Sequence, residues 1–176
     1  HNTGATYALS LSGSTSITAG TGVTLDSLND NTGTIALLSS GGIDGGSGTV
    51  LMRAANYAFG GADRTITTTG VLTIEPDADE NSFASSFDNQ YLNPVSVTGL
   101  TLGKSSNASA ITLSRAISLS GPVSIYGGSI DVNANITANS GNILLDADTG
   151  NTLNQSSTGI LLDDVITIET VTSGNL

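Results

Sequence analysis

The chain has 176 residues, an ordinary length for one domain, and 38% of them are hydrophobic. Only 11% are charged, against about 25% in a typical soluble domain, so Ser, Thr, Asn and Gly must form most of the surface. Four basic and 15 acidic side chains give a net charge of −11, which repels phosphate backbones and argues against nucleic acid as a partner. Cysteine is absent, which excludes a disulfide framework.

The residue types predict an all-β fold. Aromatic residues make up only 4% of the chain and tryptophan is absent, so Ile, Leu, Val and Ala are expected to fill the core. Gly recurs at short intervals, β-branched residues dominate, and apolar residues alternate with polar ones. This is the pattern of short strands separated by turns.

Upstream of position 75, pairs of apolar residues at positions i and i+2 mark the expected strands. They are Leu9/Leu11, Ile17/Ala19, Val23/Leu25, Ile35/Leu37, Val50/Met52, Tyr57/Phe59 and Leu72/Ile74. In a strand, such a pair points to one side and the residue between them to the other.

The segment 75–94 departs from this pattern. It holds two of the three prolines and five acidic residues. Because proline cannot donate to a central ladder, we expect an irregular loop that leaves the body of the fold. Phe83, Phe87 and Tyr91 are spaced by four, which also fits a short amphipathic helical turn at the edge of a coil.

The clearest strand pattern runs from position 111 to position 145. The apolar pairs are Ile111/Leu113, Ile117/Leu119, Val123/Ile125, Ile130/Val132, Ile136/Ala138 and Ile143/Leu145. Every third pair recurs at a nearly constant interval, which is 19 from Ile111 to Ile130 and from Ile117 to Ile136, and 20 from Val123 to Ile143. Hairpins would favour Asn-Gly or Asp-Gly turns, yet Asp-Gly occurs once and Asn-Gly never. The spacing therefore predicts a triangular parallel β-helix, or solenoid, in which every third strand stacks on its predecessor.

The pattern resumes at Ile160/Leu162 and Ile166/Ile168, so we treat residues 1–176 as a single solenoid. At this period the chain would form about nine triangular coils with one extruded loop. Coils about 4.8 Å apart would make a rod on the order of 40 Å long. The chain begins at His1 and not at Met, and no signal peptide is visible, so we interpret it as a segment of a longer protein. No apolar run approaches the roughly 20 residues that span a bilayer.

Several segments resemble the repeats of filamentous-haemagglutinin-like adhesins, which are large bacterial surface proteins. They are TIEP (73–76), SF (82–83), GLTLGK (99–104), GPVSIYGGSIDVNANI (121–136) and SGNILL (140–145). The resemblance covers roughly residues 50 to 150 and concerns the shaft of that family, not its secretion domain. It implies a right-handed β-helix, a location outside the cell, and a role in adhesion, aggregation or biofilm cohesion. It implies no catalytic residue.

Calcium is the cofactor that the acidic residues bring into consideration. The candidates are Asp77, Asp79, Glu80 and Asp88 in one group, and Asp146, Asp148 and Asn151 in another. Ca²⁺ takes about six to eight oxygen ligands, which flexible acidic loops can supply. The segment Gly41–Gly46 does not follow the repeated calcium-binding nonapeptide. We therefore predict no cofactor and no metal site, with calcium as the alternative.

The sequence gives little support to an enzyme. The only histidine, His1, is terminal, and a Ser-His-Asp triad needs a supported histidine. Some β-helical polysaccharide-cleaving enzymes combine carboxylates with Arg or Lys, for which the basic candidates are Arg53, Arg64, Lys104 and Arg115. The adjacent Asp163 and Asp164 would point to opposite faces of a strand. We predict no catalytic residue.

Three glycosylation sequons begin at Asn107, Asn135 and Asn154. In a chain rich in Asn, Ser and Thr, such triplets arise by chance. We therefore interpret these asparagines as turn and ladder residues.

The sequence predicts an extracellular, secreted or cell-surface shaft module of a large bacterial protein, without enzymatic activity. Its expected partner is a host, bacterial or glycan surface. The alternative is a self-assembling filament subunit, because the open ends of a solenoid expose unpaired strands. A polysaccharide-active enzyme is the third and least favoured alternative.

Overall fold

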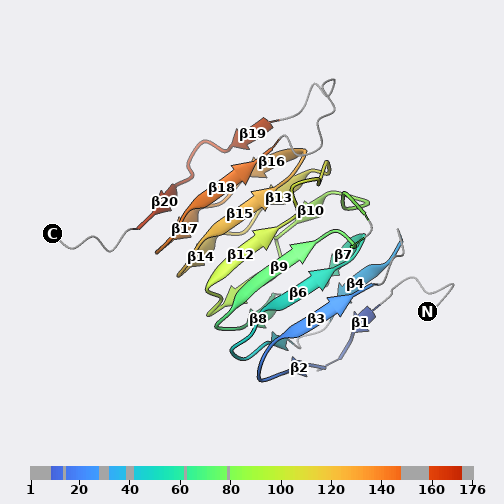
Figure 1. The fold of residues 1–176 in the computed structure, drawn as a ribbon. Coiled ribbons are helices and arrows are strands. Elements are labelled where there is room, and N and C mark those ends of the chain that lie inside the picture. The colour runs from blue at the N-terminus through green and yellow to red at the C-terminus, as the bar shows by residue number, and fades with distance from the viewer. Residues whose placement is uncertain are drawn as a thin grey trace.

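The computed structural model describes residues 9–13, 15–27, 32–38, 42–61, 63–78, 80–147 and 159–171. Over these ranges the chain forms twenty β-strands and no helix (Figure 1). Every strand pairing is parallel, and the partners are never consecutive strands. The described part of the chain is therefore an all-β parallel solenoid, as predicted.

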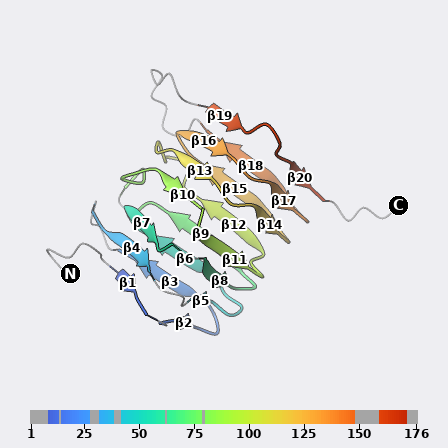
Figure 2. The ribbon, with the colours of Figure 1, turned by 180° about the vertical axis from the view of Figure 1, so that it is seen from behind.

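Each turn of the solenoid contributes three strands, which stack on the strands of the turns before and after it (Figures 1 and 2). The first side holds β1 (Leu9–Leu11), β4 (Thr34–Leu37) and β7 (Asn56–Phe59), then β10 (Phe87–Asp88), β13 (Ile111–Leu113), β16 (Ser129–Val132) and β19 (Gly159–Leu162). The second holds β2 (Ile17–Thr18), β5 (Ile43–Asp44), β8 (Arg64–Thr67) and β11 (Leu92–Val95), then β14 (Ile117–Leu119), β17 (Ile136–Ala138) and β20 (Ile168–Thr170). The third holds β3 (Val23–Asp26), β6 (Val50–Arg53), β9 (Val71–Glu75), β12 (Gly99–Leu102), β15 (Val123–Tyr126) and β18 (Ile143–Asp146).

The predicted register is confirmed in the best-patterned region. Ile111 stacks on Ile130, Ile117 on Ile136, and Val123 on Ile143. Each of these predicted intervals therefore corresponds to one turn of the solenoid.

The prediction of nine coils is wrong for the described chain. The third side forms an unbroken six-stranded sheet, which contains five complete turns. One aligned column in it passes through Val23, Val50, Leu72, Leu100, Val123 and Ile143. Of the five sequence spacings between consecutive residues of this column, only the last, from Val123 to Ile143, equals the predicted 20 residues. Each of the other four spacings is longer. At about 4.8 Å per turn, β3 and β18 lie about 24 Å apart along the axis.

The core is a continuous apolar column inside the coils. Its side chains are almost entirely Ile, Leu, Val and Ala, as predicted, with Met52, Phe83 and Phe87 in addition. Ile74, Leu102 and Ile125 are completely buried in successive turns. Each turn covers the apolar residues of its neighbours, so burial and backbone pairing both depend on stacking.

The prediction of a loop over residues 75–94 is only partly correct. Residues 76–78 and 80–86 are irregular, but the chain then returns to the ladder as β10 and β11. Phe87 lies in β10 and not in a helical turn. Pro94 lies in β11, the last strand of its sheet, where a missing N–H interrupts no further pairing. Pro94 therefore lies in the edge strand of a sheet, and the chain remains part of the solenoid at this position.

A candidate binding pocket at a break between two sheets

The first side of the solenoid is interrupted between β7 and β10. β7 pairs with β4, and β10 pairs with β13, but the two strands do not pair with each other. The backbone hydrogen bond from Ala84 N–H to the Ala55 carbonyl, 2.8 Å long, crosses the interruption. The irregular residues 80–86 enter the first side at this point, so the long connection coincides with the break in the ladder.

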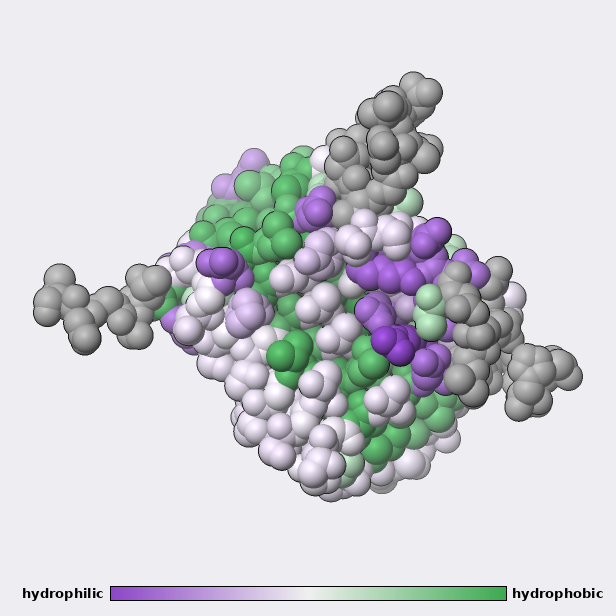
Figure 3. Space-filling model, viewed as in Figure 1, coloured by the Kyte–Doolittle hydropathy of each residue, from purple (hydrophilic) through white to green (hydrophobic). Residues whose placement is uncertain are grey.

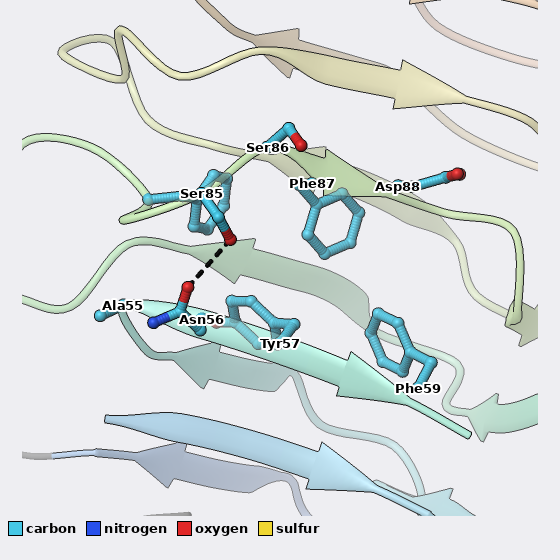
Figure 4. Close-up of a pocket in the computed structure, with 9 residues that line it drawn as sticks. Ala55, Asn56, Tyr57, Phe59, Ser85, Ser86, Phe87 and Asp88 are labelled. Carbon is cyan, nitrogen blue, oxygen red and sulfur yellow. Dashed lines mark hydrogen bonds between the residues drawn. The ribbon is translucent and has the colours of Figure 1, made fainter. Parts of the chain in front are cut away.

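Aromatic rings occupy the break. Tyr57 and Phe59 extend from β7, and Phe87 approaches from β10 on the other side (Figure 4). Phe83 packs against Tyr57 and Phe87, with ring centroids 5.7 and 5.6 Å away. Neighbouring ring centroids lie 5.6 to 6.2 Å apart, in both edge-to-face and stacked arrangements, as aromatic pairs prefer. Four of the seven aromatic residues of the chain therefore hold together two turns that share little backbone pairing on this side.

The rings form the floor of an open pocket with about 240 Å³ of empty space. Its rim is polar, with Asn56 on β7 and Ser85, Ser86 and Asp88 on or before β10 (Figure 4). The Ser85 hydroxyl donates a 2.9 Å hydrogen bond to Oδ1 of Asn56 across the pocket. Because this space includes open solvent, the room that it offers a water-sized molecule is only about 30 Å³, against about 300 Å³ or more in usual ligand pockets, so it is too small for an extended substrate.

The Tyr57 hydroxyl is not available to a ligand. It points into the solenoid, 2.8 Å from the carbonyl oxygens of both Met52 and Glu75. Burial, reinforced by the negative charge of Glu75, raises the pKa of the Tyr57 phenol well above its usual value. Its ring therefore lines the pocket while its polar end fastens β7 to β6 and β9.

We predict that Tyr57→Phe changes how the stability of the protein depends on alkaline pH. The unfolded phenol loses its proton near pH 10, whereas the folded one keeps it to higher pH. Stability is therefore lost as the pH rises from about 10 through the folded-state pKa. Tyr57→Phe should be about 1–2 kcal/mol less stable at neutral pH, because the two carbonyls lose the one hydroxyl donor that they share, but should lose less stability between about pH 9 and pH 11.

Urea unfolding midpoints across this pH range test the prediction, with Tyr126→Phe as the control. Parallel pH curves for the wild type and Tyr57→Phe would contradict the buried, protonated phenol.

Among the described residues, the acidic candidates for calcium binding do not form one group. Asp77 is fully buried, and its Oδ2 accepts a 3.1 Å hydrogen bond from Ser27. Asp88 is exposed and accepts from the backbone N–H of Gln90. Glu80 belongs to the irregular segment, Asp146 ends β18, and Asp79, Asp148 and Asn151 lie outside the described residues. In the part of the chain that the structure describes, no three His, Cys, Asp or Glu side chains could hold a metal ion together.

The basic candidates are separated as well. Arg53 lies between Asp26 and Glu75, with Nη1 3.7 Å from Asp26 and Nε 2.6 Å from Glu75, and its hydrogen bond to Glu75 raises its pKa. Arg115 forms a two-point ion pair with Asp63 that lowers the pKa of that carboxyl. The Arg53 contacts join strands of successive turns, and the Arg115–Asp63 pair joins loops two turns apart, which is a structural role.

The other two basic residues contact backbone carbonyls. Arg64 is buried and donates to the Leu37 carbonyl (2.6 Å), and Lys104 donates to the Asp77 carbonyl (3.1 Å). Asp163 accepts from the backbone N–H of Asp164. The structure therefore does not assemble a groove of carboxylates beside these cations among the described residues, and His1 lies outside them.

The sequon asparagines differ in exposure. Asn107 is fully buried and hydrogen-bonded to the backbone on several sides. Asn135 is exposed, and its Oδ1 accepts a 2.8 Å hydrogen bond from the Thr167 backbone N–H. Asn154 lies outside the described residues. Asn107 and Asn135 thus act as turn and ladder residues.

The aromatic pocket does not follow from the sequence pattern above. Phe83 and Phe87 are spaced by four, which suggests one face of a helix. A further signal is present, because Tyr57 and Phe59 repeat the same inward positions about one turn earlier.

No helix of the described residues is long and apolar enough to cross a membrane.

Comparison of the chain with protein-family models, with curated proteins and with solved structures finds no match.

Proposed function

We propose that this chain is a shaft module of an extracellular bacterial surface protein, built to span distance and not to catalyse a reaction. The observation that carries the proposal is the unbroken six-stranded sheet on the third side, above a core that continues from turn to turn. Stacking of this kind extends a body along one axis, because each turn contacts only its neighbours.

The surface supports the same role. Charged residues are few, and the outward positions of the central strands carry residues such as Thr73, Thr101 and Ser124, which are partly exposed. Such a surface can contribute to adhesion, aggregation or biofilm cohesion by lying against a host, bacterial or glycan surface. The resemblance of residues 50 to 150 to haemagglutinin-like repeats points in the same direction.

We further propose that the solenoid winds in the right-handed sense. Crossover connections between parallel strands of one sheet are right-handed in about 98% of known cases, and the family that the chain resembles has right-handed shafts. An enzymatic role receives no support from the described residues, because the basic and acidic candidates are engaged separately in structural contacts.

Immunogold labelling of intact cells that produce the protein tests the location. We expect gold particles outside the cell envelope, at a distance from it, and loss of labelling after external protease treatment. Labelling that requires permeabilised cells would overturn the proposal. Deletion of residues 9–171 from the gene should also reduce aggregation of the cells, relative to cells that carry the intact gene.

A second candidate function is a filament subunit, and one observation favours it. Within the described residues, each of the last strands, β18 to β20, pairs on one edge only, and β18 and β19 carry exposed apolar residues.

A further inference from the structure

The aromatic pocket between β7 and β10 contains rings in two nearly perpendicular orientations. The Tyr57 and Phe59 rings are close to parallel, with 18° between their planes, and so are Phe83 and Phe87, with 26°. Across the break, the planes of Phe59 and Phe87 meet at 86°. Tyr57 and Phe59 are partly exposed, whereas Phe83 and Phe87 are each 4% exposed. The pocket therefore has a buried aromatic back and a wall of two rings that solvent reaches (Figure 4).

This arrangement of rings suits a cation. The face of an aromatic ring is the negative part of its quadrupole, and a cation within about 6 Å of the ring centre is attracted to that face. Rings in two orientations let one cation approach more than one ring, which a flat stack of rings does not allow. The cation must be compact and must tolerate apolar surroundings, because the rings supply most of the contact.

The charge around the pocket has the matching sign. Of the nine described residues that line it, Asp88 alone carries a charge. The Asp88 side chain is exposed, and its Oδ1 accepts a 2.9 Å hydrogen bond from the Gln90 backbone N–H. The net charge of −11 adds a field that attracts cations and repels carboxylates and phosphates. The pocket is therefore complementary in charge to a cation and not to an anion.

The size of the pocket restricts the ligand to one compact group. The room of about 30 Å³ for a water-sized molecule exceeds the roughly 10–15 Å³ that a single water needs, but it is too small for a chain of sugars. The polar rim also offers little to a ligand that needs hydrogen bonds, because the Ser85 hydroxyl already donates to Oδ1 of Asn56. A trimethylammonium group is round, spreads its charge over methyl groups and has no N–H donor, so it needs no such partner.

The third side of the solenoid is a less suitable surface for such a group. In Figure 3, which views that side, residues of intermediate hydropathy cover much of the surface, as expected from outward residues such as Thr73, Thr101 and Ser124. Hydroxyl groups lack the ring faces that attract a quaternary ammonium ion. The break on the first side is where aromatic rings and an exposed carboxylate occur together.

We propose that the pocket binds the trimethylammonium group of a small free cation such as choline. The rings surround the methyl groups, and Asp88 balances the charge at the open side. A choline group that carries a phosphate binds more weakly, because its phosphate lies close to Asp88 in the field of an acidic protein. The site is independent of the shaft function, so a failure of one proposal leaves the other standing.

Titration followed by nuclear magnetic resonance tests the site through its own rings. The chain has only seven aromatic residues, so few ring signals overlap. Choline chloride should shift the ring protons of Tyr57 and Phe59, with a dissociation constant in the millimolar range. Dimethylbutanol, the neutral isostere with a carbon in place of the quaternary nitrogen, should bind at least about fivefold more weakly, and phosphocholine should also bind more weakly than choline.

Sodium chloride at the same concentrations is the control for ionic strength. Ring shifts with choline chloride that do not exceed those with sodium chloride would remove the site. Equal affinity for choline and dimethylbutanol would show an apolar hollow without preference for charge. Either result overturns the proposal.

Two substitutions separate the carboxylate from the ring. Asp88→Asn keeps an oxygen that can accept from Gln90 and should weaken choline binding at least about threefold, with the affinity for dimethylbutanol unchanged. Asp164→Asn makes the same change of net charge at an exposed position outside the pocket and is its control. Phe59→Leu keeps an apolar side chain but removes a ring face, and should weaken choline binding at least about fivefold.

Urea unfolding midpoints near that of the wild type show that the variants are folded. Asp88→Asn changes an exposed side chain, so it tests the site even if Phe59→Leu proves unstable. Equal effects of Asp88→Asn and Asp164→Asn would mean that choline responds only to the overall charge, and would refute binding in the pocket.

Discussion

Replacement of Asn107 by alanine is expected to lower the free energy of unfolding by about 3–4 kcal/mol. The Asn107 side chain lies in the connection between β12 and β13 and is completely buried. Its Oδ1 accepts hydrogen bonds from the backbone N–H groups of Phe83 and Ser109, each 3.2 Å long. Its Nδ2 donates to the carbonyl of Tyr126 at 2.8 Å. Alanine would remove this partner from all three backbone groups, of which the Phe83 N–H is buried and the other two are partly buried.

The matched control is Asn135→Ala, at the other described sequon. Asn135 is exposed, so water can replace the hydrogen bond that its Oδ1 accepts, and the expected loss is about 1 kcal/mol or less. Urea unfolding midpoints of the two variants, followed by far-ultraviolet circular dichroism, measure the difference. Similar losses at both positions would mean that the network around Asn107 contributes little.

The register of the solenoid is predictable where its corners are short. Between Ile111 and Ile143 the apolar pairs follow one another at steps of six or seven, so the stacking partners can be read from the spacing alone. Upstream, the connections between strands vary in length, and the turns that begin at Val23 and Leu72 are longer than the one between them. A period measured in the most compact turns overestimates the number of coils for this reason.

The aromatic cluster could not be predicted, because it depends on contacts between segments that are distant in sequence. The spacing of Phe83 and Phe87 fits a helix as well as a strand preceded by an irregular segment. The strand forms because Phe83 and Phe87 pack against Tyr57 and Phe59 of the previous turn. On the described first side, the ladder of paired strands is interrupted between β7 and β10. Contacts between the rings take the place of backbone pairing there.

The acidic segment differs from its prediction for a related reason. Composition suggests a solvated loop, but Asp77 turns inward and joins Ser27 through its carboxylate and Lys104 through its carbonyl. A carboxylate is buried only where donors compensate for lost water. One donor to the Asp77 carboxylate is the adjacent Ala78 N–H, 2.6 Å from Oδ1, but the Ser27 hydroxyl belongs to a distant turn, so the local sequence contains no sign of that partner.

Replacement of Gly103 by alanine is expected to destabilise the protein by about 3 kcal/mol or more. Gly103 directly follows β12 and has φ +75°, a conformation that costs little only for glycine. A Cβ atom there would overlap the carbonyl oxygen of Tyr126 in the next turn. Because the overlapping atom belongs to the backbone of a central strand, it cannot rotate away as a side chain would.

The two sites in this region should be coupled, because both act on the Tyr126 carbonyl. Gly103 lets β12 approach that oxygen closely, and the Asn107 amide donates to it. The double variant Gly103→Ala/Asn107→Ala should therefore lose less stability than the sum of the two single losses. Gly61→Ala is the control, since a Cβ there meets no atom within 4 Å, and its effect should stay within about 0.5 kcal/mol. Additive losses at 103 and 107 would mean that the close approach and the hydrogen bond stabilise the turn independently.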